Sequence, residues 1–237
     1  MLDFLGIGAQ KAGTTWLHEA LAAHPAVRFP AGKEVHFWDW HRSRGVDWYR
    51  RLFAESAPGT KSGEITPAYA LLPAAAIGEI REINPALRVI YTLRNPIERA
   101  WSAALMVMQR GGMTLAEASD QWFIDHFRSR NSRERGDYEP CLRRWREVMG
   151  EEQILVLRYE ALCTDPRAYL ESCCRHLGVD ATFYARVQPE ILQRRVYSGP
   201  QAALRASLRP VLRELYADKI RALAKYLDAD LSAWLES

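Results

Sequence analysis

The sequence predicts an α/β fold with a central, mainly parallel sheet flanked by helices, and three observations predict it. An apolar run at Phe4–Ile7 leads through a turn with two glycines into a helical repeat of apolar residues. The segment Arg88–Leu93 (RVIYTL) resembles strands that are buried on both faces of a parallel sheet. Strands and helices alternate along the chain, which is typical of parallel sheets with helical connections.

The middle of the chain continues this alternation. A strand is expected at Gly63–Ile65 and a helix at 74–83. Asn95 can cap a further helix, and Pro96 suits the first position of that helix. Residues 109–139 are polar and irregular in pattern, so we expect a mobile insertion there.

Order returns after this insertion. A helix face is expected at 142–149 and a buried strand at 153–159. Asp165 and Pro166 begin another helix, which Gly178 ends. The C-terminal stretch from Gln201 is expected to be helical in pieces and broken at Pro210.

Size and composition favour one globular domain over residues 1–237. The chain has 237 residues, of which 48% are hydrophobic, so it can bury one large core. Its formal charge of +3 is small and does not indicate a nucleic-acid partner. A small polyanionic ligand would suit this charge equally well.

Other sequence features bear on where in the cell the protein is expected. No stretch approaches the roughly eighteen uninterrupted apolar residues of a membrane span, and the N-terminus has no pattern of an export signal. The four cysteines include no C-x-x-C pair, so we expect reduced thiols and no zinc or other metal site. Together these features predict a cytoplasmic protein.

The first glycine-rich turn, Gly8–Gly13, suggests a phosphate-binding loop. An ATP-hydrolysing loop has a lysine directly after its second glycine, but this chain has Thr14 there, and Lys11 lies inside the loop. ATP hydrolysis is therefore not expected. Backbone N–H groups at a helix N-terminus still form an anion site, so the loop remains P-loop-like.

Two motifs resemble those of sulfotransferases that use 3′-phosphoadenosine 5′-phosphosulfate (PAPS). QKAGTTWL is similar to their 5′-phosphosulfate loop, and YTLRNPIERAWSAAL is similar to their 3′-phosphate-binding strand and helix. KEVHFWDW, GEITPAY, the GDY at Gly136–Tyr138 and QILVLRYEALCTDP resemble, in order, the heparan-sulfate-type sulfotransferase domain and its bacterial relatives. The resemblance runs from Phe4 to about Gly178.

This resemblance implies a set of donor-binding residues. Lys11 would neutralise charge on the leaving phosphate oxygen, and Arg94 and Ser102 would hold the 3′-phosphate of PAPS or of its product, 3′-phosphoadenosine 5′-phosphate (PAP). The late phosphate loop of the family has no clean counterpart here, and arginines near Tyr197 are the expected replacement. The remaining expected donor-binding residues are Ala12, Gly13, Thr14, Thr15, Trp16, Arg194 and Arg195.

The resemblance also implies a catalytic base. Glu34 matches the family's base for the acceptor hydroxyl or amine, and His36 is a rival, because histidine is the base in the branch that acts on phenols and steroids. If residues 33–38 are extended, Glu34, His36 and Trp38 project to the same side. Asp39 is expected to orient the acceptor. The aromatic residues Trp38, Trp40, Trp48 and Tyr49 are either acceptor contacts or core residues.

Three departures argue against heparan sulfate itself as the acceptor. The glycosaminoglycan enzymes have a lysine where this chain has Ile65 in GEITPAY. Their C-terminal disulfide hairpin is absent, because no cysteine follows Cys174, and their late phosphate loop is not recognisable. A carbohydrate, lipid or small-molecule acceptor all remain open.

The sequence therefore predicts a metal-independent, PAPS-dependent sulfotransferase. A P-loop nucleotide or small-molecule kinase is the first alternative and would need Mg²⁺ ligands and a lysine after Gly13. A non-catalytic PAP-binding module is the second, and it would bind PAP without any transfer. Lys11 and Glu34 argue against the second alternative.

Overall fold

The computed structural model describes residues 1–55, 57–193 and 202–236. The chain divides into two compact units, and each is described by itself. The first unit contains Met1–Leu93 and Arg143–Tyr197, and the second contains Arg94–Leu142 and Ser198–Ser237. The expectation of a single domain stays a prediction.

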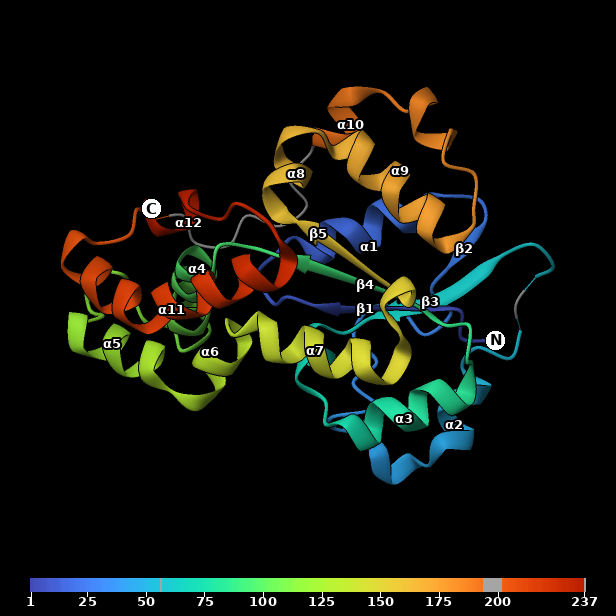
Figure 1. The fold of residues 1–237 in the computed structure, drawn as a ribbon, viewed down its shortest axis with the longest axis horizontal. Coiled ribbons are helices and arrows are strands. Elements are labelled where there is room, and N and C mark those ends of the chain that lie inside the picture. Colours follow the sequence, from blue (N-terminus) through green and yellow to red (C-terminus); the bar gives the residue numbers. More distant parts are fainter. Residues whose placement is uncertain (56, 194–201, 237) are drawn as a thin grey trace. The chain divides into compact units, whose positions relative to one another are not determined.

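A five-stranded parallel sheet forms the centre of the first unit (Figure 1). Its strands follow the order β2-β3-β1-β4-β5, so β1 lies in the middle and pairs with both β3 and β4. This arrangement confirms the predicted α/β fold. The strands are β1 (Phe4–Gly8), β2 (Val27–Arg28), β3 (Lys61–Ile65), β4 (Arg88–Leu93) and β5 (Ile154–Arg158).

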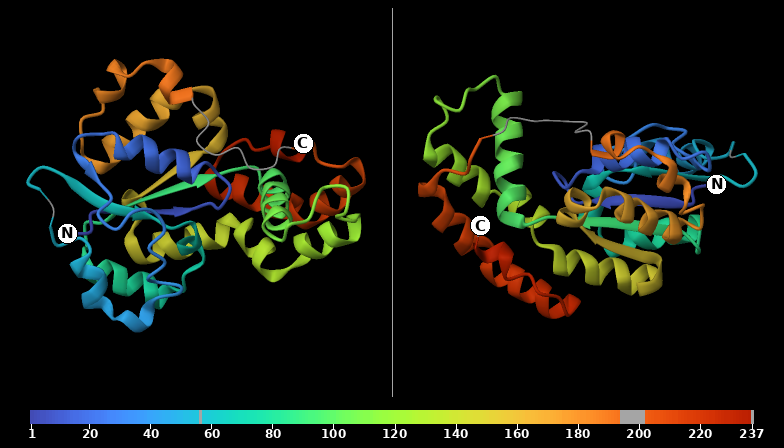
Figure 2. Two further views of the ribbon diagram at one scale, coloured as in Figure 1. Left: turned by 180° about the vertical axis from the view of Figure 1, so that it is seen from behind. Right: turned by 90° about the horizontal axis from the view of Figure 1, so that it is seen from above.

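Helices cover both faces of this sheet, which gives three layers (Figures 1 and 2). On one face lie α1 (Thr14–Ala22), α8 (Tyr159–Thr164) and α9 (Pro166–Leu177). On the other lie α3 (Ala74–Ile83) and the part of α7 (Tyr138–Met149) that belongs to this unit. The remaining helices of the unit are α2 (Val46–Arg51) and α10 (Pro189–Gln193).

The core beneath α1 and α9 explains why these sequences form these layers. Phe4, Ile65 and Ile90 from three neighbouring strands pack against Leu17 of α1 and Leu170 of α9. All five residues of β1 are buried, as expected for a central strand covered on both faces. Burial of this apolar surface is the main stabilising contribution to the unit.

The predicted limits of α9 are confirmed by its caps. The Asp165 side chain accepts a hydrogen bond from the Ala168 N–H at 3.0 Å, and Pro166 occupies the first turn. Gly178 ends the helix in the left-handed conformation, with φ of 71°.

The second unit is helical in the part of the chain that the structure describes. Residues 109–139, expected to be irregular, instead contain two helices, which begin at residues whose side chains accept the capping N–H, Ser119 and Ser129. Phe123 and Phe127 lie one turn apart and are buried, and this spacing was the missed helical signal. The unit's helices are α4 (Pro96–Arg110), α5 (Asp120–Arg128), α6 (Arg130–Arg135), α11 (Arg209–Leu227) and α12 (Ala233–Glu236), with the start of α7.

A buried arginine connects three segments of the second unit. Arg99 of α4 has no exposed surface and donates to the Ser132 carbonyl oxygen at 2.8 Å and to the Tyr216 hydroxyl at 3.4 Å. Pro210 does not break the C-terminal helix but lies in the first turn of α11, where proline needs no intrahelical partner.

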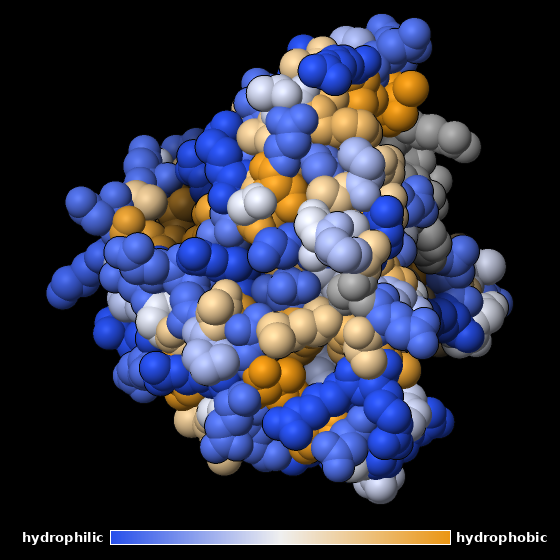
Figure 3. Space-filling model, turned by 90° about the vertical axis from the view of Figure 1, so that its right-hand side faces the viewer, coloured by the Kyte–Doolittle hydropathy of each residue, from blue (hydrophilic) through white to orange (hydrophobic). Residues whose placement is uncertain are grey.

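The surface carries the polar residues that these cores exclude. The face shown in Figure 3 is mainly hydrophilic, with apolar residues in separate small areas. Among the residues described, no helix is both long and apolar enough to cross a membrane.

We expect Gly63→Ala to destabilise the protein by about 1–3 kcal/mol, because an overpacked site must shift its backbone. A Cβ at Gly63 would lie 2.3 Å from the Phe4 carbonyl oxygen on β1. Gly78→Ala is the matched control, since nothing lies within 4 Å of its Cβ position in α3, and alanine favours a helix by about 1 kcal/mol. Urea unfolding measures both changes, and a Gly63→Ala protein as stable as wild type would contradict the packing described.

Candidate functional site

The carboxyl ends of the central strands bring two candidate segments to one edge of the first unit. β1 ends at Gly8. The turn Gly8–Gly13, which we call the Lys11 loop, begins there. β3 ends at Ile65, whose carbonyl oxygen accepts the Glu34 N–H at 3.2 Å. In parallel α/β sheets, this carboxyl edge is where ligands bind.

The Lys11 loop has a backbone suited to an anion. The Ala9 N–H donates to the Thr92 carbonyl oxygen at 2.7 Å, so the start of the loop is tied to β4, and the Ala12 N–H donates to the Ala9 carbonyl oxygen at 3.1 Å. Lys11 and Gly13 have positive φ angles of 71° and 78°. Turns with left-handed residues group N–H donors into concave anion-binding surfaces.

The first turn of α1 adds further donors beside this loop. The Leu17 N–H donates to the Gly13 carbonyl oxygen at 2.9 Å. The N–H groups of Thr14, Thr15 and Trp16 precede it and have no intrahelical acceptor. These groups carry the positive end of the helix dipole, which favours a negative charge at this position.

Two residues here are fixed by packing. A Cβ on Gly13 would lie 3.1 Å from Leu162 and 3.2 Å from the Tyr159 ring, so both side chains would have to shift, and the φ of 78° also favours glycine. The Trp16 indole N–H donates to the Leu192 carbonyl oxygen at 3.0 Å and anchors α1 on α10. Trp16 can therefore contribute its backbone N–H to a ligand, while its side chain is used for packing.

The segment expected to be extended, residues 33–40, has turns and no strand, so that expectation is wrong. Glu34 and His36 have left-handed backbones, with φ of 64° and 53°. Their side chains nevertheless meet, because the His36 Nε2 lies 3.1 Å from a Glu34 carboxylate oxygen. Trp38, expected on the same side, is buried in the core.

Glu34 lies in a cluster of alternating charges. One carboxylate oxygen accepts from Lys33 Nζ and the other contacts His36. Burial by itself raises the pKa of Glu34, but the hydrogen bonds and charges of Lys33 and His36 outweigh it, so the pKa lies below its ordinary value. The Glu34 side chain is 41% exposed, so an ionised carboxylate is accessible at this edge.

His36 is held between two carboxylates. Its Nδ1 lies 2.9 Å from Asp39 and its Nε2 lies 3.1 Å from Glu34. A ring that donates to both carboxylates must be an imidazolium, because neutral imidazole carries one N–H. In this arrangement His36 is a partner of Glu34, and Asp39 orients His36.

The aromatic residues of this segment divide into core and surface. Tyr49 has no exposed surface and stacks on Phe37 at 4.7 Å, and Trp38 is also buried. Trp40 is 68% exposed and its ring stacks on His36, with centroids 3.7 Å apart. Trp40 is therefore the aromatic that an acceptor can reach beside Glu34.

Arg94 and Ser102 lie in the second unit. Arg94 directly follows β4, and its guanidinium donates to Glu98 at 3.1 and 3.2 Å. Ser102 is one helical turn beyond Glu98, so both lie on the same face of α4. The expected ligands Arg194 and Arg195, and Tyr197 near them, lie outside the described residues.

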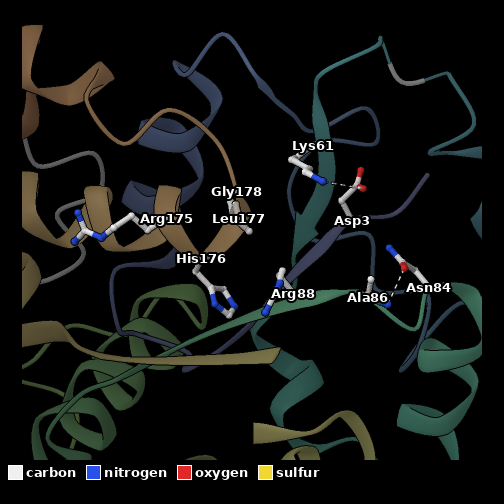
Figure 4. Close-up of a pocket in the computed structure, with 9 residues that line it drawn as sticks. All are labelled: Asp3, Lys61, Asn84, Ala86, Arg88, Arg175, His176, Leu177 and Gly178. Carbon is white, nitrogen blue, oxygen red and sulfur yellow. Dashed lines mark hydrogen bonds and ion pairs between the residues drawn. The ribbon is translucent and has the colours of Figure 1, made fainter. Parts of the chain in front are cut away.

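A pocket of about 300 Å³ lies at the opposite, amino edge of the sheet (Figure 4). Lys61 faces Asp3 there at 3.9 Å, and Figure 4 shows the Arg175 side chain directed away from the other basic residues. None of the residues predicted from the motifs lines this pocket. The chemistry therefore points to the carboxyl edge instead.

Sequence reasoning missed two residues of this region. Lys33 is paired with Glu34, and only its position next to Glu34 in the chain could have indicated this. Glu64 in GEITPAY has no exposed surface and lies beneath residues 33–40, which we call the Glu34 segment. The strand that holds it reads KSGEI, with one apolar side chain, so no local pattern marked Glu64 as buried.

Comparison with known proteins agrees with the fold and motifs. The chain is 30% identical to mouse heparan sulfate glucosamine 3-O-sulfotransferase 3B1 over 187 residues, which is 73% of this chain and 45% of that protein. Human heparan sulfate glucosamine 3-O-sulfotransferase 6 is 38% identical over 96 residues, 40% of this chain and 28% of that protein. The chain thus matches less than half the length of these relatives.

Solved structures share the fold across almost the whole chain. A sulfotransferase from Alicyclobacillus acidocaldarius has a TM-score of 0.76 at 24% identity, with 99% of this chain and 98% of that chain covered. Mouse sulfotransferase SULT7A1, solved in complex with PAP, has a TM-score of 0.57 at 16% identity, with 95% and 89% covered.

A model of one family spans most of the chain. The sulfotransferase domain matches residues 2–206, which include the Lys11 loop, the Glu34 segment and the start of α4. The resemblance inferred from the motifs is confirmed, and the chain belongs to the sulfotransferase domain family.

Proposed function

We propose that the protein transfers a sulfuryl group from PAPS to a hydroxyl or amine of a carbohydrate, lipid or small-molecule acceptor. The observation that carries this proposal is the position of the Lys11 loop and the Glu34 cluster at one edge of the same sheet in a sulfotransferase-family chain. One segment has the donors for an anion, and the other has an exposed carboxylate that can accept a proton.

The 5′-phosphosulfate of the donor is assigned to the Lys11 loop. The N–H groups of Thr14, Thr15 and Trp16 at the start of α1 would bind its oxygens, and the Lys11 ammonium would stabilise charge on the leaving oxygen. The PAP complex of mouse SULT7A1 supports a donor of this class. Arg94 and Ser102 are the proposed 3′-phosphate ligands, assigned from their motif.

In the proposed transfer step, one bond to sulfur forms as another breaks, and one proton moves to Glu34. The Glu34 carboxylate takes the proton of the acceptor hydroxyl as its oxygen forms a bond to sulfur. The bond between sulfur and the bridging oxygen breaks, and its electron pair stays on the 5′-phosphate of PAP, beside Lys11. The Lys33 and His36 contacts keep Glu34 ionised and therefore able to accept a proton.

The acceptor is assigned to the surface around Trp40. The exposed indole stacks on His36 and so lies next to the Glu34 carboxylate. An indole face suits the C–H face of a sugar or another flat apolar group. Asp39 is proposed to act on the acceptor through His36, whose Nδ1 it contacts.

Label transfer tests this function directly. The protein is incubated with ³⁵S-labelled PAPS and an unfractionated metabolite extract, and labelled products are separated and identified. We expect label in an acceptor and PAP in equal amount. PAP binding without any transfer would favour a non-catalytic binding module, and ATP turnover without PAP binding would favour a kinase.

Lys11→Ala is expected to lower kcat about 10²- to 10³-fold, the usual loss when one preorganised electrostatic contact is removed. The circular dichroism spectrum should not change. Lys61→Ala is the matched control, because Lys61 faces Asp3 at the other edge of the sheet. Wild-type turnover in Lys11→Ala would refute the assigned role.

Glu34→Gln is expected to lower kcat about 10²- to 10⁴-fold with little change in PAPS affinity, because a base is lost but no donor contact. The low pKa of Glu34 also has a consequence for wild type. Activity falls only when acid protonates the carboxylate, so the acidic limb of kcat/KM should lie below 4.5, the ordinary value for Glu34. An active Glu34→Gln together with an inactive His36→Ala would reverse the assignment of the base.

Arg94→Ala is expected to weaken PAP binding at least tenfold while binding of adenosine 5′-phosphosulfate changes less than threefold, since only PAP has a 3′-phosphate. Isothermal calorimetry with both nucleotides measures this difference. Glu98→Ala is a useful companion, because it removes the carboxylate that now holds the guanidinium. Equal weakening of both nucleotides by Arg94→Ala would exclude a specific 3′-phosphate contact.

A further inference from the structure

A buried carboxylate lies directly beneath the Glu34 segment and has no part in the transfer step. Glu64 of β3 has no exposed surface. One of its oxygens accepts from the Tyr49 hydroxyl at 2.6 Å and from the Tyr69 hydroxyl at 3.1 Å. The other accepts from the Thr66 hydroxyl at 2.5 Å and from the Val35 N–H at 3.1 Å.

This set of donors suits an ionised carboxylate. An ionised Glu64 has about four lone-pair sites, and four donors converge on it. Burial raises the pKa of Glu64 above its ordinary value, and the hydrogen bonds from Thr66, Tyr49, Tyr69 and the Val35 N–H offset only part of this effect. Removing a carboxylate from water costs free energy, so a buried carboxylate needs hydrogen-bond donors that are held in place.

Glu64 reaches the Glu34 segment by two routes. The first is direct, through the Val35 N–H. The second passes through Tyr69, whose hydroxyl donates to Glu64 and accepts from the Phe37 N–H at 2.9 Å. Val35 and Phe37 are the two neighbours of His36, so these hydrogen bonds hold the backbone on both sides of it.

The segment needs such support. Glu34 and His36 are non-glycine residues in the left-handed region. Residues in this conformation cost free energy and persist only where the surrounding structure holds them. Without the hydrogen bonds at Val35 and Phe37, the backbone can relax, and the side chains of Glu34 and His36 then separate.

We propose that Glu64 is a positioning residue for the base, and that its hydrogen bonds hold Glu34 and His36 in the left-handed conformation required for transfer. This inference rests on the proposed function, because it assumes that Glu34 accepts the proton. Glu64 itself touches neither donor nor acceptor. Its effect passes through the backbone of residues 34–37.

Three variants separate positioning from general stability. Glu64→Gln changes the acceptor itself, because its amide group places donors where hydroxyl and N–H donors already converge. Tyr69→Phe removes only the indirect route and is the milder change. Tyr184→Phe is the matched control, because Tyr184 is equally buried and its hydroxyl donates to the Ala20 carbonyl oxygen at 2.8 Å, in α1.

Hydrogen exchange followed by mass spectrometry reads the order of the segment without any activity. In peptides covering residues 33–40, we expect exchange at least tenfold faster in Glu64→Gln and Tyr69→Phe than in wild type. Tyr184→Phe should stay within threefold. If Glu64→Gln does not fold, Tyr69→Phe carries the comparison alone. Unchanged exchange in the folded variants would overturn the proposal.

Turnover per PAP-binding site supplies the second readout. PAP calorimetry gives the concentration of competent sites, and ³⁵S-labelled PAPS with the metabolite extract gives transfer. We expect a loss of at least tenfold per site with PAP affinity within twofold of wild type, which a loss of folded protein alone would not produce. Faster exchange with unchanged turnover per site would overturn the positioning role.

The same measurements on the wild-type protein distinguish failure of the proposed function from failure of the inference about Glu64. A wild-type protein that neither binds PAP nor transfers label overturns the proposed function, and with it the role of Glu64 toward a base. A wild-type protein that binds PAP and transfers label, with variants that transfer equally well, overturns only the inference about Glu64.

Discussion

The parallel pairing of β1 with β3 is the constraint on which the candidate site depends. Phe4 lies opposite Gly63 and Gly6 opposite Ile65, so both strands end at the same edge of the sheet. The Lys11 loop leaves one strand and the Glu34 segment is hydrogen-bonded to the other. This pairing requires glycine at position 63, because a side chain there would enter the Phe4 backbone.

Positive and negative side chains alternate in the Glu34 cluster at this edge. Lys33 and His36 face Glu34, and Asp39 faces His36, so two cationic partners meet two carboxylates when the imidazole is protonated. These contacts keep Glu34 ionised but also make it a weaker base. A site arranged this way depends on the acceptor proton becoming more acidic as sulfur binds its oxygen, which limits how much the base must contribute.

The backbone beneath this cluster explains how it can persist. The Glu64 carboxylate, the Ile65 carbonyl oxygen and the Tyr69 hydroxyl accept backbone N–H groups of the 33–38 segment. These hydrogen bonds hold the segment in a conformation that its residues do not favour by themselves. Rigid support of this kind is what a functional side chain needs, because small displacements of a base are costly to the rate. The buried polar groups here are thus connected to one another and to the site.

The strands β1, β3, β4 and β5, the helices that Asn95 and Asp165 cap, and the Lys11 loop were predictable from sequence, because apolar periodicity, capping residues and glycine spacing act locally. The short strand β2 and the helices α5 and α6 were not predicted. The candidate residues Lys11, Glu34 and Arg94 were also named from motifs. The conformation of residues 33–40 was not predictable, because tertiary hydrogen bonds to β3 override the extended preference of that sequence.

The sequence by itself therefore determined the fold class, the family and the residue types available for transfer. Only the tertiary structure decided that Trp40 is exposed while Trp38 and Tyr49 are buried, that Lys33 and His36 hold Glu34, and that Glu64 lies beneath them. The physical reason is that these contacts join residues on different elements or in unusual backbone conformations. Apart from the adjacency of Lys33 and Glu34 in the chain, local pattern carries no information about such contacts.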